Sequence, residues 1–341
     1  MNKQALKDIA QKLMAGNKGL LAMDESIPTA NKRFKEAGIP QTIEYRRKYR
    51  ELIVTTPGLG ECISGAILFD ETIKQTTTDG TPFLEVMSRI GIIPGIKLDD
   101  GAKDMAAFPG EKITEGLDGL RERLVGYAEA GIKFAKWRAV IIITDELPTD
   151  GNIYANAYAL ARYATLCQEA GLVPIIEPEV LMDGDHTIER CFEVTERVLH
   201  IVFEVLISQR VYLEGMILKP NMVLPGLKSP VQVDADKVAY ETIKCLLRCV
   251  PAAVPGIAFL SGGQSDIAAT EHLNAMHVKY KGKLPWALTF SFARAIQQPA
   301  MDYWKGKDAN VAIAQQLLCH RASMNNAARR GEYKKEMENN Q

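Results

Sequence analysis

Charged side chains stand at or near the ends of five short, mostly apolar segments of this 341-residue chain. They are Asp24, Lys97, Lys136, Arg138, Glu177, Glu179 and Lys219. Alternate residues of a strand share one face, so Lys136 and Arg138 would point the same way, as would the two glutamates. Cations and carboxylates around a partly dry cavity shift one another's pKa values, which suits acid and base chemistry. A solvated strand end or a structural ion pair is the alternative for any single residue, but it weakens when five segments share the pattern.

Lys219 is the candidate nucleophile. It follows the mostly apolar segment 213–218 and precedes Pro220, which disfavours a helical backbone at the lysine. Burial and a neighbouring cation such as Lys136 would favour its neutral amine, the form that attacks a carbonyl carbon to make an imine. A lysine whose stem lies along apolar surface while its head reaches water is an equally good interpretation of the local sequence.

A pair of glycines offers a candidate phosphate site. Ser261, Gly262 and Gly263 lie between a predicted strand and a predicted helix, where backbone N–H groups and a helix N-terminus can hold an anion. Arg294, which follows Ser291, adds a guanidinium that could reach the same anion. A glycine pair is more often an ordinary turn, and Arg294 could equally be an exposed helix residue.

The motifs do not support metal or nucleotide chemistry. The five histidines form no short-spaced ligand pair on a predicted strand or helix, and the acidic segment 183–186 is typical of a turn. Neither the lysine-containing phosphate loop nor the glycine fingerprint of dinucleotide-binding folds occurs. The six cysteines include no Cys-x-x-Cys pair, so we expect buried free thiols rather than disulfides.

Composition excludes nucleic-acid and membrane partners. The 41 Lys and Arg residues nearly balance 42 Asp and Glu residues, so the chain has no overall field that would attract nucleic acid or an anionic membrane. The longest apolar runs, such as 139–143, are far shorter than the roughly 18 residues typical of a spanning helix. Residues 1–16 predict an amphipathic helix rather than a secretory signal, so we expect a cytoplasmic protein.

The elements that must position these residues repeat regularly. Short β-rich segments alternate with longer amphipathic ones to about residue 330. The eight predicted strands are 19–24, 65–70, 92–97, 134–138, 173–179, 213–219, 256–261 and 286–291. Helices are predicted at 41–55, 117–130, 154–170, 188–208, 234–250 and 265–276. This pattern predicts an α/β fold, a single-domain (β/α)8 TIM barrel over residues 1–341, with its chemistry at the C-terminal strand ends. A doubly wound open sheet is the alternative, and it requires one or two of these strands to be wrong.

The segments that carry the candidate residues resemble class I fructose-bisphosphate aldolases over nearly the whole chain. The matching stretches are GLLAMDES at 19–26, KFAKWR at 133–138, IEPE at 176–179, LEGMILKPNM at 213–222, FLSGGQS at 259–265 and PWALTFSFAR at 285–294. The resemblance implies an enzyme of glycolysis and gluconeogenesis that reversibly cleaves fructose 1,6-bisphosphate to dihydroxyacetone phosphate and glyceraldehyde 3-phosphate. It also implies that the enzyme needs no metal or organic cofactor and that it is a homotetramer.

The resemblance assigns roles to individual residues. Lys219 matches the family's imine-forming lysine, and Glu177 matches its general acid and base. Asp24, Lys136 and Glu179 match the charged groups that orient the imine and assist proton transfer. The positions that match one phosphate site are Arg33, Ser261, Gly262, Gly263, Ser291 and Arg294. The positions that match the other phosphate and the sugar hydroxyls are Ser26, Lys97 and Arg138.

Two departures from the animal pattern of this family bear on these roles. Ile27, Pro28 and Thr29 stand where that pattern has Thr-Gly-Ser, so we expect phosphate contacts from this loop to differ. The sequence ends at Gln341 without the terminal tyrosine of animal members, and Tyr333, in a charged helix-like segment, is not assigned its role. The alternatives are a transaldolase, an aldolase for another sugar bisphosphate such as sedoheptulose 1,7-bisphosphate, and a noncatalytic sugar-phosphate sensor. Two phosphate clusters favour a bisphosphate, and the retained catalytic residues argue against a sensor.

Overall fold

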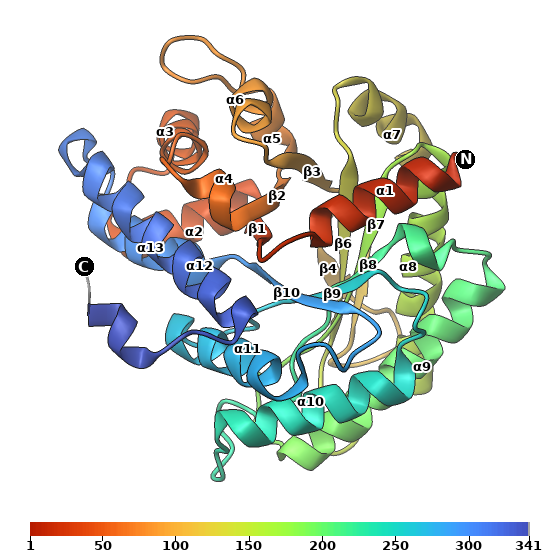
Figure 1. Ribbon diagram of the computed structural model, residues 1–341. Coiled ribbons are helices and arrows are strands. Elements are labelled where there is room, and N and C mark those ends of the chain that lie inside the picture. Colours follow the sequence, from red (N-terminus) through yellow and green to blue (C-terminus); the bar gives the residue numbers. More distant parts are fainter. Residues whose placement is uncertain (340–341) are drawn as a thin grey trace.

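Eight parallel strands close into a barrel in the computed structural model, which describes residues 1–339 (Figure 1). The strands are β1 (Gly19–Met23), β2 (Ile63–Leu68), β3 (Ile93–Lys97), β6 (Phe134–Ile141), β7 (Val173–Val180), β8 (Ile217–Leu218), β9 (Gly256–Phe259) and β10 (Ala287–Phe292). They follow one another around the barrel in chain order, and β10 pairs again with β1. The closed parallel barrel confirms the predicted (β/α)8 fold and excludes the open sheet. Gln341, on which the prediction about the chain end rests, lies outside the described residues.

Helices connect the strands and surround the barrel (Figure 1). The longer ones are α1 (Lys3–Met14), α2 (Ile27–Ala37), α3 (Ile43–Val54), α7 (Leu120–Glu129), α8 (Asp150–Glu169), α9 (Ile188–Ser208), α10 (Ala235–Cys249), α11 (Asp266–Tyr280), α12 (Arg294–Trp304) and α13 (Val311–Arg330). Shorter elements are α4 (Leu59–Cys62), α5 (Asp70–Ile73), α6 (Phe83–Arg89) and the 3-10 segments η1 (Leu213–Gly215), η2 (Asp308–Asn310) and η3 (Lys335–Asn339). Across residues 1–339, no helix is both long and apolar enough to cross a membrane.

Polar side chains at helix starts explain why the sequence predicted these helices well. Side chains of six residues accept a hydrogen bond from the backbone N–H three residues later, which satisfies a donor that has no partner within the helix. These residues are Asn2, Thr42, Thr149, Thr187, Asp234 and Ser265. Each of these residues precedes a helix that starts within four residues of its predicted position. The prediction works because the capping residue and the apolar periodicity both depend only on residues close together in the sequence.

The structure differs from the predicted elements in several places. Strand β6 runs on to Ile141, so Lys136 and Arg138 lie inside this strand rather than at its end, whereas β7 extends only one residue beyond its predicted end. The prediction of a strand over 213–219 was wrong in its first half, where η1 forms and leaves β8 with two residues. Gln168 Nε2 donates to the carbonyl oxygens of Tyr212 (2.8 Å) and Gly215 (3.2 Å), which provides these groups with partners outside the barrel ladder. A short antiparallel pair, β4 (Ala102–Asp104) and β5 (Lys112–Thr114), was not predicted.

Apolar packing fills the N-terminal end of the barrel. Phe134 lies inside the barrel because two neighbouring glycines leave room for its ring. A Cβ atom at Gly95 would lie 2.3 Å from that ring, and one at Gly65 would lie 3.0 Å from it. Helix α1 crosses this end (Figure 1), and its Leu6 and Leu13 belong to the same buried cluster as Phe134. The opposite end, where the strands finish, is therefore available for chemistry.

Candidate active site

A cavity of about 1070 Å³ opens where the strands finish, and every site residue chosen from the sequence lines it. These residues are Asp24, Ser26, Arg33, Lys97, Lys136, Arg138, Glu177, Glu179, Lys219, Ser261, Gly262, Gly263, Ser291 and Arg294. They come from segments as far apart in the chain as β1 and α12. Closure of the barrel brings the C-terminal ends of all these strands to one mouth.

Lys219 is buried in the cavity wall beside Glu177. Its Nζ lies 3.2 Å from Glu177 Oε1, and the two residues are 3% and 4% exposed. Lys219 directly follows β8, and its backbone N–H donates to Ile176 of the neighbouring β7 (2.8 Å). Glu177 Oε2 is also buried and accepts no hydrogen bond from the part of the chain that the structure describes. An amine beside a carboxylate oxygen that accepts no hydrogen bond can exchange protons with a carbonyl compound in the cavity.

Lys136 forms the electrostatic centre of the site. Its Nζ lies 2.8 Å from Asp24 Oδ2, 3.6 Å from Glu177 Oε2 and 3.8 Å from Asp99 Oδ2. Burial opposes its charge, but the three carboxylates outweigh burial and raise the pKa of Lys136. Burial likewise opposes ionisation of Asp24, yet the ammonium groups of Lys136 and Lys219 lower its pKa to about 2. Asp24 and Lys136 therefore carry opposite charges at neutral pH.

A second set of ion pairs lies on the same side of the barrel. Arg138 of β6 pairs with Glu179 of β7, so the two pairs predicted from alternation do converge across neighbouring strands. Burial opposes the charge of Arg138, but Glu179 and Glu177 outweigh it and raise the pKa of the guanidinium. Lys97 of β3 lies 2.8 Å from Asp99 Oδ1. An anionic ligand near either cation would have to compete with these carboxylates.

The glycine pair, Ser291 and Arg294 gather at one side of the mouth. Gly262 and Gly263 have φ angles of 57° and 94°, a left-handed backbone that glycine adopts without strain and that can turn successive N–H groups toward an anion. A Cβ atom at Gly263 would lie 3.8 Å from Arg294 Nη2, so the guanidinium is adjacent to this turn. The Ser291 hydroxyl is buried and has no hydrogen-bond partner among residues 1–339. Together these groups can hold a phosphate.

The loop after β1 and the start of α2 line the mouth next to β10, the strand that carries Ser291. Ser26 Oγ and Thr29 Oγ1 are 3.0 Å apart and line the cavity, so Thr29 does retain a hydroxyl at the site despite the changed loop sequence. Arg33 pairs with Glu25 and donates to Gln298 Oε1 (3.2 Å). These contacts hold the guanidinium at the cavity edge.

Several cavity residues were missed by the sequence analysis. Asp99 stands two residues after Lys97, and Glu25 follows directly after a selected aspartate, so the pattern of charges at strand ends could have identified both. Gln298 reaches the cavity from α12. Arg50 does not line the cavity, but its Nη1 lies 2.9 Å from Oε2 of the cavity residue Glu25. No local signal marks Arg50 or Gln298, because helix packing alone brings them here.

Comparison with known proteins identifies the family. The model of glycolytic class I fructose-bisphosphate aldolases matches residues 5–341. A probable class 1 fructose-bisphosphate aldolase of Xanthomonas campestris is 54% identical over 335 residues, which are 98% of this chain and 100% of that protein. The chain belongs to the class I fructose-bisphosphate aldolase family.

Plant and parasite aldolases extend this similarity. Cytosolic fructose-bisphosphate aldolase 4 of Arabidopsis thaliana is 51% identical over 317 residues, 93% of this chain and 80% of that protein. A solved structure of the Plasmodium falciparum aldolase, in complex with TRAP and a small-molecule inhibitor, matches with a TM-score of 0.95 and 47% identity over 97% of this chain and 96% of that one. The aldolase barrel is therefore preserved across nearly the entire chain.

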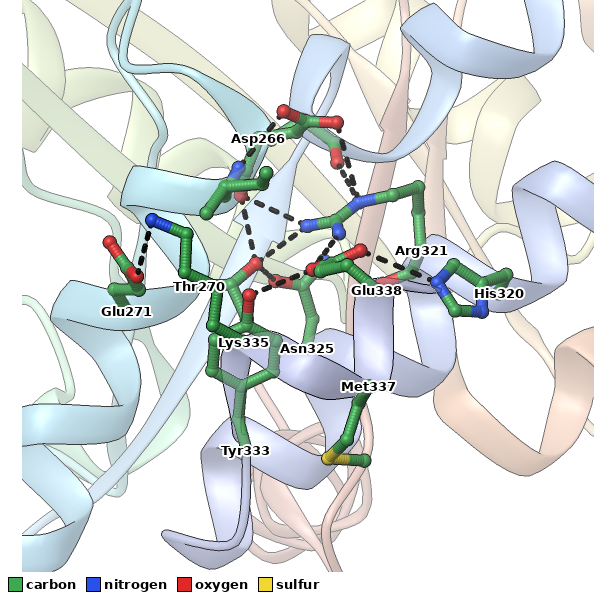
Figure 2. Close-up of polar contacts among 12 residues, drawn as sticks. Asp266, Thr270, Glu271, His320, Arg321, Asn325, Tyr333, Lys335, Met337 and Glu338 are labelled. Carbon is green, nitrogen blue, oxygen red and sulfur yellow. Dashed lines mark hydrogen bonds and ion pairs between the residues drawn. The ribbon is translucent and has the colours of Figure 1, made fainter. Parts of the chain in front are cut away.

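The C-terminal segment of this aldolase packs beside the helix that follows the glycine pair (Figure 2). Glu338 of η3 pairs with Arg321 and lies 3.3 Å from His320 Nε2, and the hydroxyl of Tyr333 donates to it (2.9 Å). Arg321 Nη2 also donates to the carbonyl oxygen of Asp266 (3.0 Å), the first residue of α11 and a cavity residue. The charged segment around Tyr333 was predicted to be helix-like, and residues 335–339 of it do form the 3-10 segment η3, but Tyr333 itself lies between α13 and η3.

Proposed function

We propose that Lys219 forms an imine with the carbonyl carbon of fructose 1,6-bisphosphate and that this chain cleaves the sugar reversibly to dihydroxyacetone phosphate and glyceraldehyde 3-phosphate. Membership of the class I family makes the chain a carbon–carbon lyase of glycolysis and gluconeogenesis. The observation that carries the assignment of Lys219 is its buried amine, 3.2 Å from a carboxylate oxygen of Glu177, in the wall of the large cavity.

The first half of the reaction builds the imine. The Lys219 amine attacks C2 of the open-chain sugar, and loss of water leaves a protonated imine. Glu177, beside the amine, delivers a proton to the departing oxygen and takes protons from the nitrogen. A protonated imine is an electron sink, so it can accept the electron pair released when the adjacent carbon–carbon bond breaks.

The second half breaks the C3–C4 bond and releases both products. A base takes the proton of the C4 hydroxyl, and this carbon leaves as the aldehyde of glyceraldehyde 3-phosphate. The remaining enamine takes a proton at C3, and water hydrolyses the imine to release dihydroxyacetone phosphate. Asp24, kept ionised beside Lys136, can stabilise the positive imine and accept the hydroxyl proton. Glu179, paired with Arg138, is the second candidate for this base.

Two sets of cationic and hydroxyl groups line the mouth and suit the two phosphates of the substrate. One phosphate would contact Arg33, Ser261, Gly262, Gly263, Ser291 and Arg294. The other phosphate and the sugar hydroxyls would contact Ser26, Lys97 and Arg138. The unpartnered Ser291 hydroxyl supports the first assignment, since a buried hydroxyl without a protein partner is costly unless a ligand provides one.

Reductive trapping tests the proposal. Incubation with dihydroxyacetone phosphate and then borohydride should add one triose-derived group, which a peptide map should place on Lys219. Lys219→Met should lose both the adduct and cleavage, whereas the matched cavity variant Lys97→Met should keep the adduct. Normal turnover by Lys219→Met, or an adduct on a different lysine, would refute the assignment.

The assembly and location of the enzyme are further parts of the proposal. We propose a homo-oligomer, a tetramer as is common in the family, built from one catalytic domain over residues 1–341. The cytoplasm is the proposed location, supported by the relatives named as cytosolic in Arabidopsis thaliana. Light scattering in solution and fractionation of cells test these two statements.

A further inference from the structure

A second cluster of reactive side chains lies outside the active-site cavity, between α9 and α10. Glu196 and His200 are one turn apart on α9, and Cys249 is the last residue of α10. A carboxylate oxygen, an imidazole nitrogen and the Sγ atom of these three residues all lie within 4.8 Å of one another. Residues four apart share one face of a helix, so both α9 side chains face the same neighbour.

The spacing of these atoms suits a zinc ion. Zn²⁺ binds thiolate, imidazole and carboxylate atoms at about 2.0 to 2.3 Å, which puts two ligands of a tetrahedral site about 3.3 to 3.8 Å apart. Ligand atoms already within 4.8 Å of one another therefore need to move by only about 1 Å. His200 is exposed, and this allows its ring to rotate into place.

The ligand atoms have few partners within the described part of the chain, and the main one is a half-exposed arginine. Glu196 Oε1 is buried and accepts no hydrogen bond of regular geometry from residues 1–339, although Arg248 Nε lies 2.5 Å away. The Cys249 thiol makes only a weak contact with the backbone oxygen of Glu196 (3.6 Å). Arg248 opposes a bound cation, but its side chain is 55% exposed and can turn toward water.

A second sulfur lies next to the cluster. Cys245 is one turn before Cys249 on α10 and is buried. Sulfur and imidazole ligands select zinc over magnesium and calcium, which prefer oxygen. We propose that Glu196, His200 and Cys249 bind one Zn²⁺ ion per chain, with a water molecule as the fourth ligand and Cys249 as its one sulfur ligand. The Cys249 thiol gives its proton to solvent on binding, and the ion joins α9 to α10.

Metal titration of the full chain tests this site. Chelator-treated protein is titrated with Zn²⁺ against a chromophoric chelator, and with Co²⁺ to detect a sulfur-to-metal charge-transfer band. We expect one ion per chain and the band. Cys249→Ser should lose the band, and both it and His200→Ala should weaken zinc binding by about 10- to 100-fold. The control Cys319→Ser, which changes a half-buried cysteine outside the cluster, should bind like the unaltered protein.

Arg248 provides a test in the opposite direction. Arg248→Gln removes the cation beside Glu196, so zinc affinity should rise by up to about fivefold, the range of an exposed ion pair. All four variants should keep normal aldolase turnover, since none of these residues lines the cavity. The proposal is overturned if no stoichiometric ion binds, if Cys249→Ser keeps the cobalt band, or if Cys319→Ser loses binding as well.

Discussion

Replacing Lys136 by methionine should destabilise the protein because it removes the cation shared by three carboxylates. The Lys136 side chain is 5% exposed, and its Nζ lies 2.8, 3.6 and 3.8 Å from oxygens of Asp24, Glu177 and Asp99. Methionine is also long and unbranched, so it can occupy much of the same space. The main effect of Lys136→Met is therefore loss of charge rather than creation of a cavity.

The size of the effect follows from the pKa of Asp24. The fall of this pKa from 3.8 to about 2 corresponds to about 2 kcal/mol of stability, after the opposing effect of burial. That stability is fully present above pH 3.8 and is lost as the pH falls through about 2. Without Lys136, Glu177 and Asp99 also lose attraction, so we expect a loss of about 3 to 5 kcal/mol near neutral pH, as for other broken buried pairs.

Urea unfolding at one protein concentration measures this loss. In the variant, without Lys136, burial dominates and raises the pKa of Asp24. This carboxyl can then take up a proton at about pH 5, so the loss of stability should be smaller at about pH 5 than at about pH 7. Lys74→Met is the matched control, since Lys74 pairs with Asp70 at 2.6 Å but both side chains are exposed. It should change stability by less than about 1 kcal/mol. A loss below about 1 kcal/mol for Lys136→Met at about pH 7, or one that does not shrink at about pH 5, would refute the reasoning.

Three other predictions follow from the fold and the site. Gly95→Ala should lower the free energy of unfolding in urea by about 1 to 3 kcal/mol, because its Cβ would lie 2.3 Å from the Phe134 ring. Gly126 lies inside α7, and no neighbouring atom of residues 1–339 would lie within 4 Å of a Cβ atom there, so Gly126→Ala should instead raise the free energy of unfolding by about 0.5 to 1 kcal/mol. The same change in stability for both substitutions would contradict this explanation. Ser291→Ala should raise KM for fructose 1,6-bisphosphate about tenfold or more. The free energy of unfolding in urea should not change, since the Ser291 hydroxyl has no protein partner in residues 1–339. An unchanged KM would show that Ser291 does not belong to the phosphate site. Glu338→Gln should speed hydrogen exchange in residues 333–339. Burial raises the pKa of Glu338, but its hydrogen bonds outweigh burial and lower that pKa below 4.5, so in the unaltered protein the protection of this segment should weaken as the pH falls below 4.5. Hydrogen exchange that the substitution leaves unaffected would contradict this role of Glu338.

Local patterns in the sequence were sufficient for the architecture. Eight β-rich segments separated by amphipathic ones predict the barrel, and each of the eight corresponds to an observed strand. The largest error was at 213–215. Gln168 donates there to the carbonyl oxygens of Tyr212 and Gly215, 44 and 47 residues later in the chain, and these hydrogen bonds favour a 3-10 turn. Periodicity describes which face of a segment is apolar, but it gives no information about a distant side chain, such as that of Gln168, that donates hydrogen bonds to two carbonyl groups of the segment.

The candidate site could be selected from the sequence because strand ends in this fold share one mouth. Charged residues at strand ends and the glycine pair therefore identified cavity residues before their distances were known. Gln298, which reaches the cavity from α12, and Arg50, which pairs from α3 with the cavity residue Glu25, could not be found in this way, since helix packing brings them there. The same holds for the cluster of Glu196 and His200 with Cys249, because no short motif joins residues of two separate helices.

The sequence by itself determined the order of the elements, the starts of the capped helices and the chemical groups at the strand ends. Only the tertiary structure decided which of those groups touch. Lys219 lies beside Glu177, and Lys136 lies beside both Asp24 and Glu177. The physical reason is that propensity, capping and periodicity act over a few residues, whereas distances of 3 to 4 Å between charges depend on strand register and barrel closure. Those distances in turn keep the Asp24 carboxyl ionised and leave Glu177 Oε2 without a hydrogen bond from residues 1–339, available for proton transfer.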